Sequence, residues 1–162
     1  MIIEKLNKYH LKDNFDCGNE ILNTFLKKYA LQNQNRYFVG TTYVSTKANQ
    51  VIGYITIAAS SIKQTDIKTK KPYKELPILK IARLAVDKDH HKKGIGKELL
   101  KFALFKALYM QENFGCIGVA VDAKEEAKTF YEKFGFIEIT PIEKTLTIPL
   151  FLSIKTIKKA IS

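Results

Sequence analysis

Two glycines separated by one residue, Gly94 and Gly96, follow a pair of lysines near the middle of the chain. A short apolar run over 78–86 precedes them and is typical of a buried strand. From Lys97 onward, leucine, phenylalanine and alanine recur at helical spacing. Backbone amides at such a strand–loop–helix junction converge on one spot, where the helix dipole also favours negative charge. The pattern predicts either a phosphate cradle or only the tight start of a helix.

The glycine spacing excludes two common phosphate-binding loops. The loop of nucleotide hydrolases requires Gly-Lys-Ser/Thr after four intervening residues, and the dinucleotide fingerprint requires a third glycine. The pattern that starts at His91, x-x-Gly-x-Gly with basic residues, instead resembles the pyrophosphate-binding motif of GNAT-family acetyl-coenzyme A-dependent N-acetyltransferases. That family usually opens the motif with Gln or Arg. His91 stands in this place, and an imidazole can still donate to an oxygen.

Two further stretches extend the resemblance. Ala127 to Phe136 looks like the second GNAT signature, Ala-x-x-Phe-Tyr-x-x-x-Gly-Phe, one strand after the glycine-loop helix. Asp16 to Gln34 and Arg83 to Asp87 resemble GNAT toxins of toxin–antitoxin pairs. The likeness spans Lys5 to about Leu152. Those toxins acetylate the α-amino group of amino acids carried on tRNA and so block translation.

The resemblance implies an α/β chain with the GNAT (acyl-CoA N-acyltransferase) fold, in which helices flank a central mixed, mostly antiparallel sheet. It implies one N-acetyltransferase domain over 1–162, acetyl-CoA as cosubstrate and no metal. Expected partners are aminoacyl-tRNA, an antitoxin protein and a second copy of the chain. The expected cofactor contacts are Leu84, Ala85, Val86, His91, Lys92, Lys93, Gly94, Ile95, Gly96, Lys97, Asp122 and Phe130.

Hydrophobic periodicity and turn residues predict the remaining elements. Asp16 is expected to cap a helix whose apolar face runs from Ile21 to Tyr29, and Asp122 to cap a later one. Gly135 should end the later helix. The expected strands lie at 2–6, 37–46, 51–59, 117–122, 136–140 and 145–154, with a loop or lid at 60–77 and a fraying basic tail at 155–162.

The chain carries 27 Lys and Arg against 16 Asp and Glu, a formal charge of +11. This excess is either a solvated basic surface or the mark of a polyanionic partner, such as RNA in addition to the cofactor. Cys17 and Cys116 have no metal-ligand spacing and are expected to be reduced. The first ten residues are too polar for a signal peptide, and no apolar run approaches the roughly 20 residues of a membrane helix. We therefore expect a cytoplasmic protein without a membrane contact.

Acetyl transfer requires a polarised thioester and a proton for the leaving thiolate. Backbone N–H groups of Leu84 to Val86 are expected to polarise the carbonyl. In the family, the tyrosine that corresponds to Tyr131 faces the cofactor sulfur, which predicts Tyr131 as the general acid. A packed tyrosine that only shapes the pocket is the alternative.

The acceptor amine must be neutral when it attacks. A lysine amine has a pKa of about 10.4, whereas an α-amino group has a pKa of about 7.7–8.0. The strand 78–86 contains Lys80 and Arg83 but no carboxylate, which is consistent with a weakly basic aminoacyl ester. Arg83 is expected to meet either an RNA phosphate or a nearby acid.

Three further basic residues are candidate tRNA contacts, although a solvated helix face is their default explanation: Lys27, Lys28 and Arg36. His90 is expected to be a surface residue of the loop. The leading hypothesis is a toxin that acetylates aminoacyl-tRNA. The alternatives are a housekeeping enzyme that acetylates a small amine or a protein N-terminus, and a non-catalytic acyl-CoA or RNA-binding module.

Overall fold

The computed structural model describes residues 2–140 and 146–161. Seven strands form one sheet in the order β1-β2-β3-β4-β5-β7-β6. The pair β4–β5 is parallel, while β1–β2, β2–β3, β5–β7 and β6–β7 are antiparallel. This order confirms the mixed, mostly antiparallel sheet of the expected fold. The chain divides into two compact units, Met1–Ala58 with Ala82–Ala103 and Ala59–Ile81 with Leu104–Ser162.

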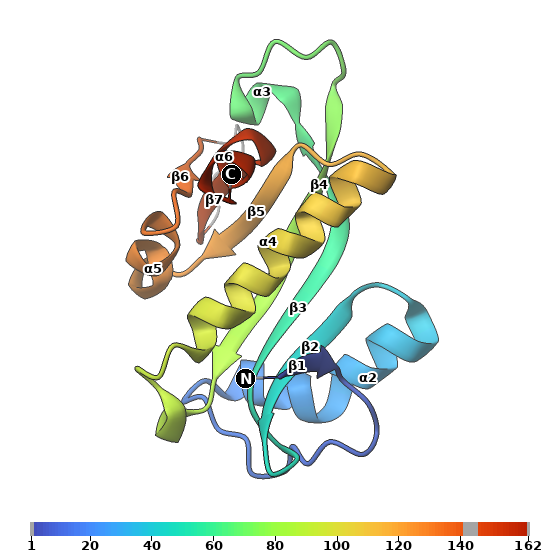
Figure 1. The fold of residues 1–162 in the computed structure, drawn as a ribbon, viewed down its shortest axis with the longest axis vertical. Coiled ribbons are helices and arrows are strands. Elements are labelled where there is room, and N and C mark those ends of the chain that lie inside the picture. The colour runs from blue at the N-terminus through green and yellow to red at the C-terminus, as the bar shows by residue number, and fades with distance from the viewer. Residues whose placement is uncertain (1, 141–145, 162) are drawn as a thin grey trace. The chain divides into compact units, whose positions relative to one another are not determined.

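The first unit contains β1 (Ile3–Lys5), β2 (Thr41–Lys47) and the first part of β3 (Gln50–Lys63). β2 and β3 form the predicted hairpin, and Ala48 and Asn49 make its turn with positive φ angles (Figure 1). β2 begins at Thr41, so the expectation of a strand from Tyr37 is wrong at its start. Tyr37 still belongs to the preceding helical segment.

That helical segment runs without a break from Glu20 to Tyr37, as α1 (Glu20–Thr24), a π turn (Phe25–Tyr29), α2 (Ala30–Gln32) and a second π turn (Asn33–Tyr37). The cap is Asn19, whose side chain accepts a hydrogen bond from the Leu22 amide, so the prediction that Asp16 caps this helix is wrong. The π turns widen the helix and change which residues face inward. Phe25 and Leu26 are buried, whereas Ile21 and Tyr29 are exposed.

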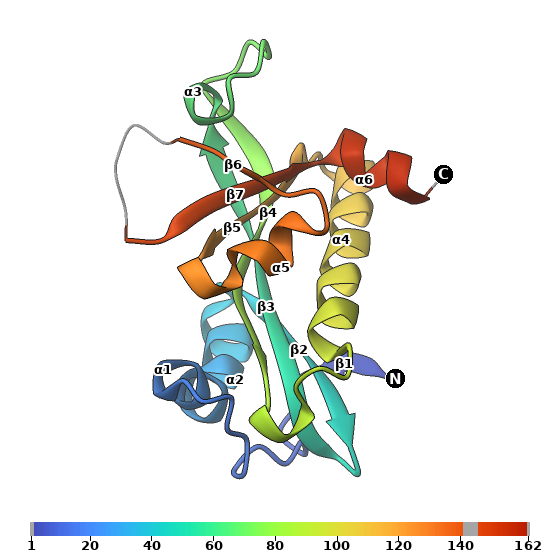
Figure 2. The ribbon, with the colours of Figure 1, turned by 90° about the vertical axis from the view of Figure 1, so that its left-hand side faces the viewer.

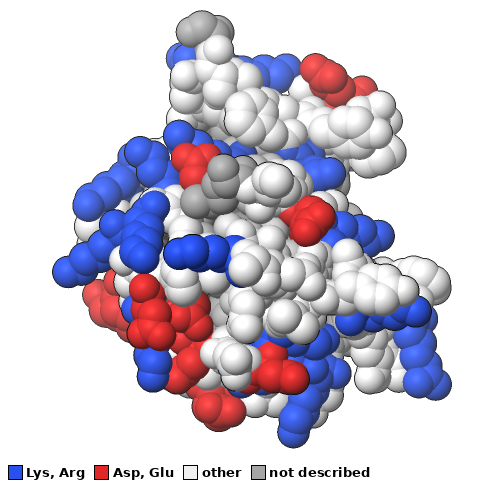
Figure 3. Space-filling model, turned by 60° about the horizontal axis from the view of Figure 1, so that its bottom comes forward, with Lys and Arg blue, Asp and Glu red and all other residues white. Residues whose placement is uncertain are grey.

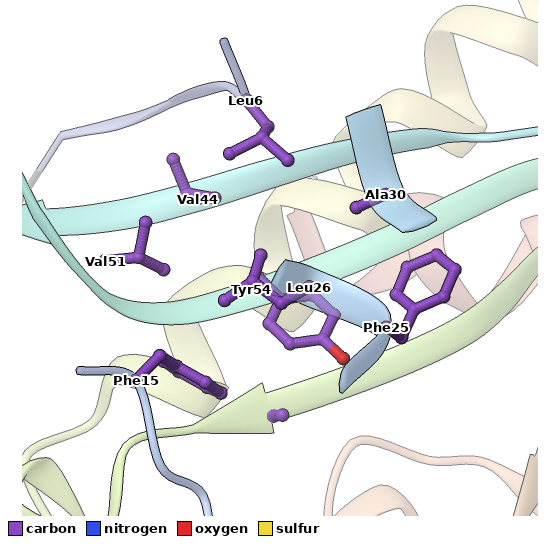
Figure 4. Packing of buried hydrophobic residues seen from close by; sticks show 9 residues of the cluster. Leu6, Phe15, Phe25, Leu26, Ala30, Val44, Val51 and Tyr54 are labelled. Carbon is purple, nitrogen blue, oxygen red and sulfur yellow. The ribbon is translucent and has the colours of Figure 1, made fainter. Parts of the chain in front are cut away.

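The core of the first unit forms around the ring of Tyr54 on β3 (Figure 4). Phe15 meets this ring edge-on at 5.6 Å between centroids, and Phe25 stacks on it at 6.2 Å. The Tyr54 hydroxyl donates to the carbonyl of Leu22 at 2.7 Å. Buried rings of this size contribute much of a core's apolar burial, and the hydrogen bond satisfies the one polar atom inside it. The helical segment is therefore fixed to β3 by both packing and a hydrogen bond.

In the second unit, β5 (Gly118–Ala123) pairs with β7 (Ile148–Ser153), and β7 also pairs with β6 (Ile137–Glu138) (Figure 2). β4 spans Glu75–Val86 and α3 spans Gln64–Ile67. The expected loop or lid at 60–77 is only partly correct, because β3 continues to Lys63 and β4 begins at Glu75. The part that remains outside strands is α3 and the turn that follows it.

Two short helices follow β5 and β7 in this unit: α5 (Lys128–Glu132), after a 3-10 turn over Glu125–Ala127, and α6 (Ile154–Ile161). Asp122 lies within β5, so its predicted capping role is wrong. The expected fraying of the tail is also wrong over its described part, because α6 buries Ile154 and Ile157. Residue 145, where the last strand was expected to begin, lies outside the described residues.

Candidate active site

The glycine loop connects β4 to α4 (Ile95–Asn113) through a 3-10 turn over Lys88–His90. Lys92 and Gly94 both have left-handed backbones, with φ of 62° and 79°. The first helical hydrogen bond runs from the Glu98 amide to the Gly94 carbonyl at 3.1 Å. The amides of Ile95, Gly96 and Lys97 lie in the first turn and therefore have no acceptor within the helix. These amides, with Lys92, Lys93 and Lys97 exposed beside them, fit an anionic diphosphate group.

His91, the residue that departs from the usual motif, closes this loop on itself. Its Nε2 lies 2.8 Å from the carbonyl oxygen of Val86 at the end of β4. Because a carbonyl only accepts, Nε2 is the donor and carries the proton. The donor that we expected to reach the cofactor is thus used inside the loop, although the side chain is exposed and Nδ1 is not engaged by this bond. His91 holds the loop to the strand end.

His90 is half-buried, and its Nδ1 lies 3.3 Å from Asp87 Oδ1. His90 lies in the 3-10 turn between β4 and the glycine loop, so the expectation of a surface residue is only partly correct.

A second set of contacts joins this loop to the start of the helical segment. The Asp16 amide donates to Asp87 Oδ2 at 3.0 Å, and the Lys88 amide donates to the Asp16 carbonyl at 2.8 Å. Lys88 Nζ also lies 3.0 Å from Asp16 Oδ2, and Asn23 Nδ2 donates to Asp16 Oδ1. We call these residues, Asp16, Asn23, Asp87 and Lys88, the Asp16–Asp87 junction. Sequence reasoning missed it because its two parts lie 71 positions apart and neither carries a local signal.

The junction carboxylates are stabilised in their ionised form. The amide of Gly18, then Lys88 and Asn23, lower the pKa of Asp16 far below its ordinary value. Burial alone would raise the pKa of Asp87, but hydrogen bonds from the Asp16 and Asp89 amides and from His90 more than offset it and lower that pKa. The junction therefore depends on charge at neutral pH.

Leu84 to Val86, the predicted contacts for the thioester, form the last part of β4. The parallel ladder between β4 and β5 covers only Leu79–Ile81 of β4, paired with Val119–Val121. Leu84 to Val86 thus lie beyond the ladder, and Leu84 and Val86 are half-buried. β4 is also paired with β3 along its other edge, where the Asp87 amide donates to the Ile52 carbonyl, so only the backbone groups that face the β5 side can serve as an oxyanion-binding amide.

Tyr131 lies on α5 in the second unit and is 5% exposed. Phe130 and Phe136 meet its ring edge-on, with centroids 5.1 and 5.4 Å away. Gly135, with φ of 98°, turns the chain after α5, as the sequence predicts. Among the described residues, no group accepts a hydrogen bond from the Tyr131 hydroxyl. Burial raises the pKa of Tyr131, so the phenol keeps its proton at neutral pH.

Asp122, on β5, forms an ion pair with Lys80 of β4 at 2.9 Å. Both line a cavity of about 260 Å³ within the second unit, together with Asp66 of α3. The sequence of strand 78–86 shows no carboxylate, but the fold brings one to Lys80 from the neighbouring strand. Phe130, the other expected cofactor contact outside the loop, packs against Tyr131 and Phe134.

The candidate RNA contacts lie in the first unit. The guanidinium of Arg83 lies over the buried ring of Phe25, 3.7 Å from its centroid. No ion pair joins Arg83 to an acidic side chain among the described residues. The expectation that Arg83 pairs with a nearby acid is therefore not met in the described part of the chain. Lys28 and Arg36 are exposed and Lys27 is half-buried. On the face shown in Figure 3, basic side chains occur in several groups with acidic ones between them.

Comparison with known proteins decides the family. Residues 36–138 match the acetyltransferase (GNAT) domain family. The chain belongs to the GNAT family of acetyltransferases. As a GNAT enzyme it is an N-acetyltransferase with acetyl-CoA as acyl donor, and the glycine loop offers the amides and lysines that such a donor needs. Among the described residues, no group of three or more His, Cys, Asp or Glu side chains could hold a metal ion.

Individual relatives are similar over nearly the same length. A curated "tRNA-acetylating toxin" from Mycobacterium tuberculosis is 28% identical over 135 residues, 80% of each chain. AtaT complexed with acetyl-methionyl-tRNAfMet superposes with a TM-score of 0.90 at 28% identity and covers 99% of both chains. AtaTR bound with AcCoA gives a TM-score of 0.84 at 29% identity, over 99% of this chain and 98% of that one. These similarities confirm the likeness to GNAT toxins.

Two other features bear on the expected setting. Neither Cys17 nor Cys116 forms a disulfide bond within the described part of the chain. None of the helices in the described part of the chain is long and apolar enough to cross a membrane.

Proposed function

We propose that this GNAT enzyme transfers the acetyl group of acetyl-CoA to the α-amino group of aminoacyl-tRNA and so acts as a toxin that blocks translation. The single observation that carries the proposal is the near-complete likeness, at a TM-score of 0.90, to AtaT complexed with acetyl-methionyl-tRNAfMet. In this proposal the enzyme acts in the cytoplasm as a homodimer, and an antitoxin protein restrains it.

In the proposed mechanism, the amides of Ile95 to Lys97 and the lysines of the glycine loop hold the diphosphate of the acyl donor. A strand-end amide of Leu84 to Val86 donates to the thioester oxygen as negative charge develops there. The amine nitrogen bonds to the carbonyl carbon, the carbon–sulfur bond breaks, and the amine proton passes to solvent. The Tyr131 phenol gives its proton to the departing thiolate and regains one from solvent. Burial keeps this phenol protonated at neutral pH, as an acid must be, and also makes it a weaker acid than the thiol it forms, whose ordinary pKa is about 8.5.

The substrate proposal is tested with labelled acetyl-CoA and total charged tRNA. Wild-type protein should yield acetylated aminoacyl-tRNA, whereas transfer only to free amines or to protein N-termini would refute it and favour the housekeeping alternative. Expression of the wild-type protein alone should also arrest growth.

The acid is tested by Tyr131→Phe, which keeps the ring contacts with Phe130 and Phe136 and removes only the hydroxyl. Loss of a positioned acid should lower kcat by roughly 100-fold or more, with little change in the Kd for acetyl-CoA. Tyr109→Phe, at an exposed tyrosine of α4, is the matched control and should leave both unchanged. An unchanged kcat in Tyr131→Phe would remove the hydroxyl from the mechanism.

A further inference from the structure

Two aromatic rings at the end of the helical segment of the first unit point away from any core. Tyr37 is 50% exposed, and Phe38, the residue that ends the segment, is 82% exposed. Single exposed apolar residues are common on proteins, but two adjacent large rings at one turn form a small apolar surface. Packing within the described chain does not account for the ring of Phe38.

The backbone at Phe38 makes its identity more unusual. Its φ of 57° and ψ of 35° are left-handed, at the helix C-terminus where glycine or asparagine is the favoured residue. The Phe38 amide donates a hydrogen bond to the Asn33 carbonyl and so caps the helical segment. This bond does not involve the side chain. A bulky residue held in this conformation is strained, and strain that folding does not require is typical of functional positions.

The rings sit in a basic and carboxylate-free part of the chain. Between Glu20 and Asp66 there is no aspartate or glutamate, whereas Lys27, Lys28 and Arg36 all fall there. The Arg36 guanidinium lies 5.6 Å from the centroid of the Tyr37 ring, and Gln32 Nε2 lies 3.2 Å from the Tyr37 hydroxyl. These two contacts orient the Tyr37 ring before any partner binds.

We propose that Tyr37 and Phe38 form a stacking platform for unpaired bases of RNA, with Arg36 contacting the adjoining phosphate. Proteins that bind single-stranded nucleic acid combine exposed aromatic rings with nearby cations, because every base has a face that stacks. The absence of carboxylates in this part of the sequence favours a polyanion over a protein partner. The inference rests on the proposed function in one respect: the unpaired 3′ end of the charged tRNA is the RNA that would reach the platform.

The chain contains no tryptophan, which allows a direct test. Phe38→Trp places a single fluorophore on the platform, and Phe114→Trp places one at a comparably exposed phenylalanine, 78% exposed, in the second unit. Each variant is titrated with a short unpaired oligoribonucleotide that ends in CCA. We expect saturable quenching at position 38 that weakens with added salt, and none at position 114. No quenching at position 38, or equal quenching at both, would overturn the platform.

Phe38→Gly tests the same surface through the reaction. Glycine suits the left-handed backbone, so the variant removes the ring without endangering the fold. We expect the KM for charged tRNA to rise about ten-fold, within the usual value of one stacked base, with the KM for acetyl-CoA unchanged. An unchanged KM for charged tRNA would refute the platform while leaving the proposed function intact. If wild type fails to acetylate charged tRNA but position 38 is still quenched by RNA, the proposed function fails and the platform stands.

Discussion

Replacing Gly53 with alanine should push the start of α4 away from the sheet. A Cβ built on Gly53 would lie 2.8 Å from Cγ2 of Ile95 and 3.1 Å from Cδ1 of Leu99. Carbon atoms prefer a separation of at least about 3.5 Å, so Ile95 must move by about 0.7 Å. Ile95 is 3% exposed and its Cγ2 is attached directly to Cβ, so the methyl group has no free rotation by which to avoid the contact.

The expected cost follows from these contacts. Overpacking of a filled core costs about 1–3 kcal/mol of stability. Alanine has less conformational freedom than glycine in the unfolded chain, which offsets about 0.4–1 kcal/mol of that cost. We therefore expect a net loss of about 1–2 kcal/mol, which lowers Tm by about 2–8 °C for a chain of this size. Because Ile95 directly follows Gly94, the same shift disturbs the loop amides. The Kd for acetyl-CoA should rise about ten-fold, equivalent to about 1.4 kcal/mol.

Thermal unfolding and titration calorimetry with acetyl-CoA measure the two effects. Gly40→Ala is the matched control, because its new Cβ would lie at ordinary distances, 3.4 Å from the Ile57 carbonyl oxygen and 3.6 Å from Thr56 Cγ2. The reasoning is refuted if Gly53→Ala unfolds at the wild-type temperature, or if Gly40→Ala weakens acetyl-CoA binding equally.

Three further outcomes are expected. Gly94→Ala places a side chain on a backbone with φ of 79° and should lower the free energy of unfolding by about 1–2 kcal/mol. Calorimetry should also show that acetyl-CoA binds about ten-fold more weakly. Gly18→Ala, with φ of 87° and equally open space, should lose similar stability without that loss of affinity. Asp16→Asn should lower the urea midpoint of unfolding at pH 7. Because the pKa of Asp16 is lowered in the folded state, this difference from wild type should shrink as the pH falls below about 3.9, the ordinary pKa in an unfolded chain. A difference of the same size at pH 3 would contradict the prediction. Phe38→Gly should unfold at the wild-type temperature or slightly above it in a thermal scan, because it relieves a left-handed phenylalanine.

Local patterns predict most of the elements of this chain. The apolar run before the glycine loop, the stripe after it and the turn at Ala48 and Asn49 all determine structure through neighbouring residues. The errors arise where distant contacts decide. Asp16 has the residue type of a helix cap, but Asp87 and Lys88 engage it from the far end of β4, and Asn19 caps the helix instead.

In the candidate site, too, local motifs could be predicted from the sequence, whereas contacts between distant residues could not. The loop and Tyr131 could be proposed as site residues because each lies in a contiguous motif. The partner of Lys80 was not found, since Asp122 reaches it only through the parallel pairing of β4 with β5. The π turns also escaped prediction, because the apolar spacing from Ile21 to Tyr29 fits a regular helix. That spacing correctly placed Phe25 and Leu26 on the buried face, but it also placed there Ile21 and Tyr29, which are exposed.

The Asp16–Asp87 junction links the two ends of the first unit that the proposals assign to different ligands. One end precedes the loop that would hold the acyl donor, and the other begins the helical segment that ends in the stacking platform. A ligand that rigidifies either end reduces the entropy that the other must lose on binding. Thermodynamic linkage then requires reciprocity: if the acyl donor tightens RNA binding by some factor, RNA must tighten donor binding by the same factor. Asp16→Asn should reduce these two coupling factors together.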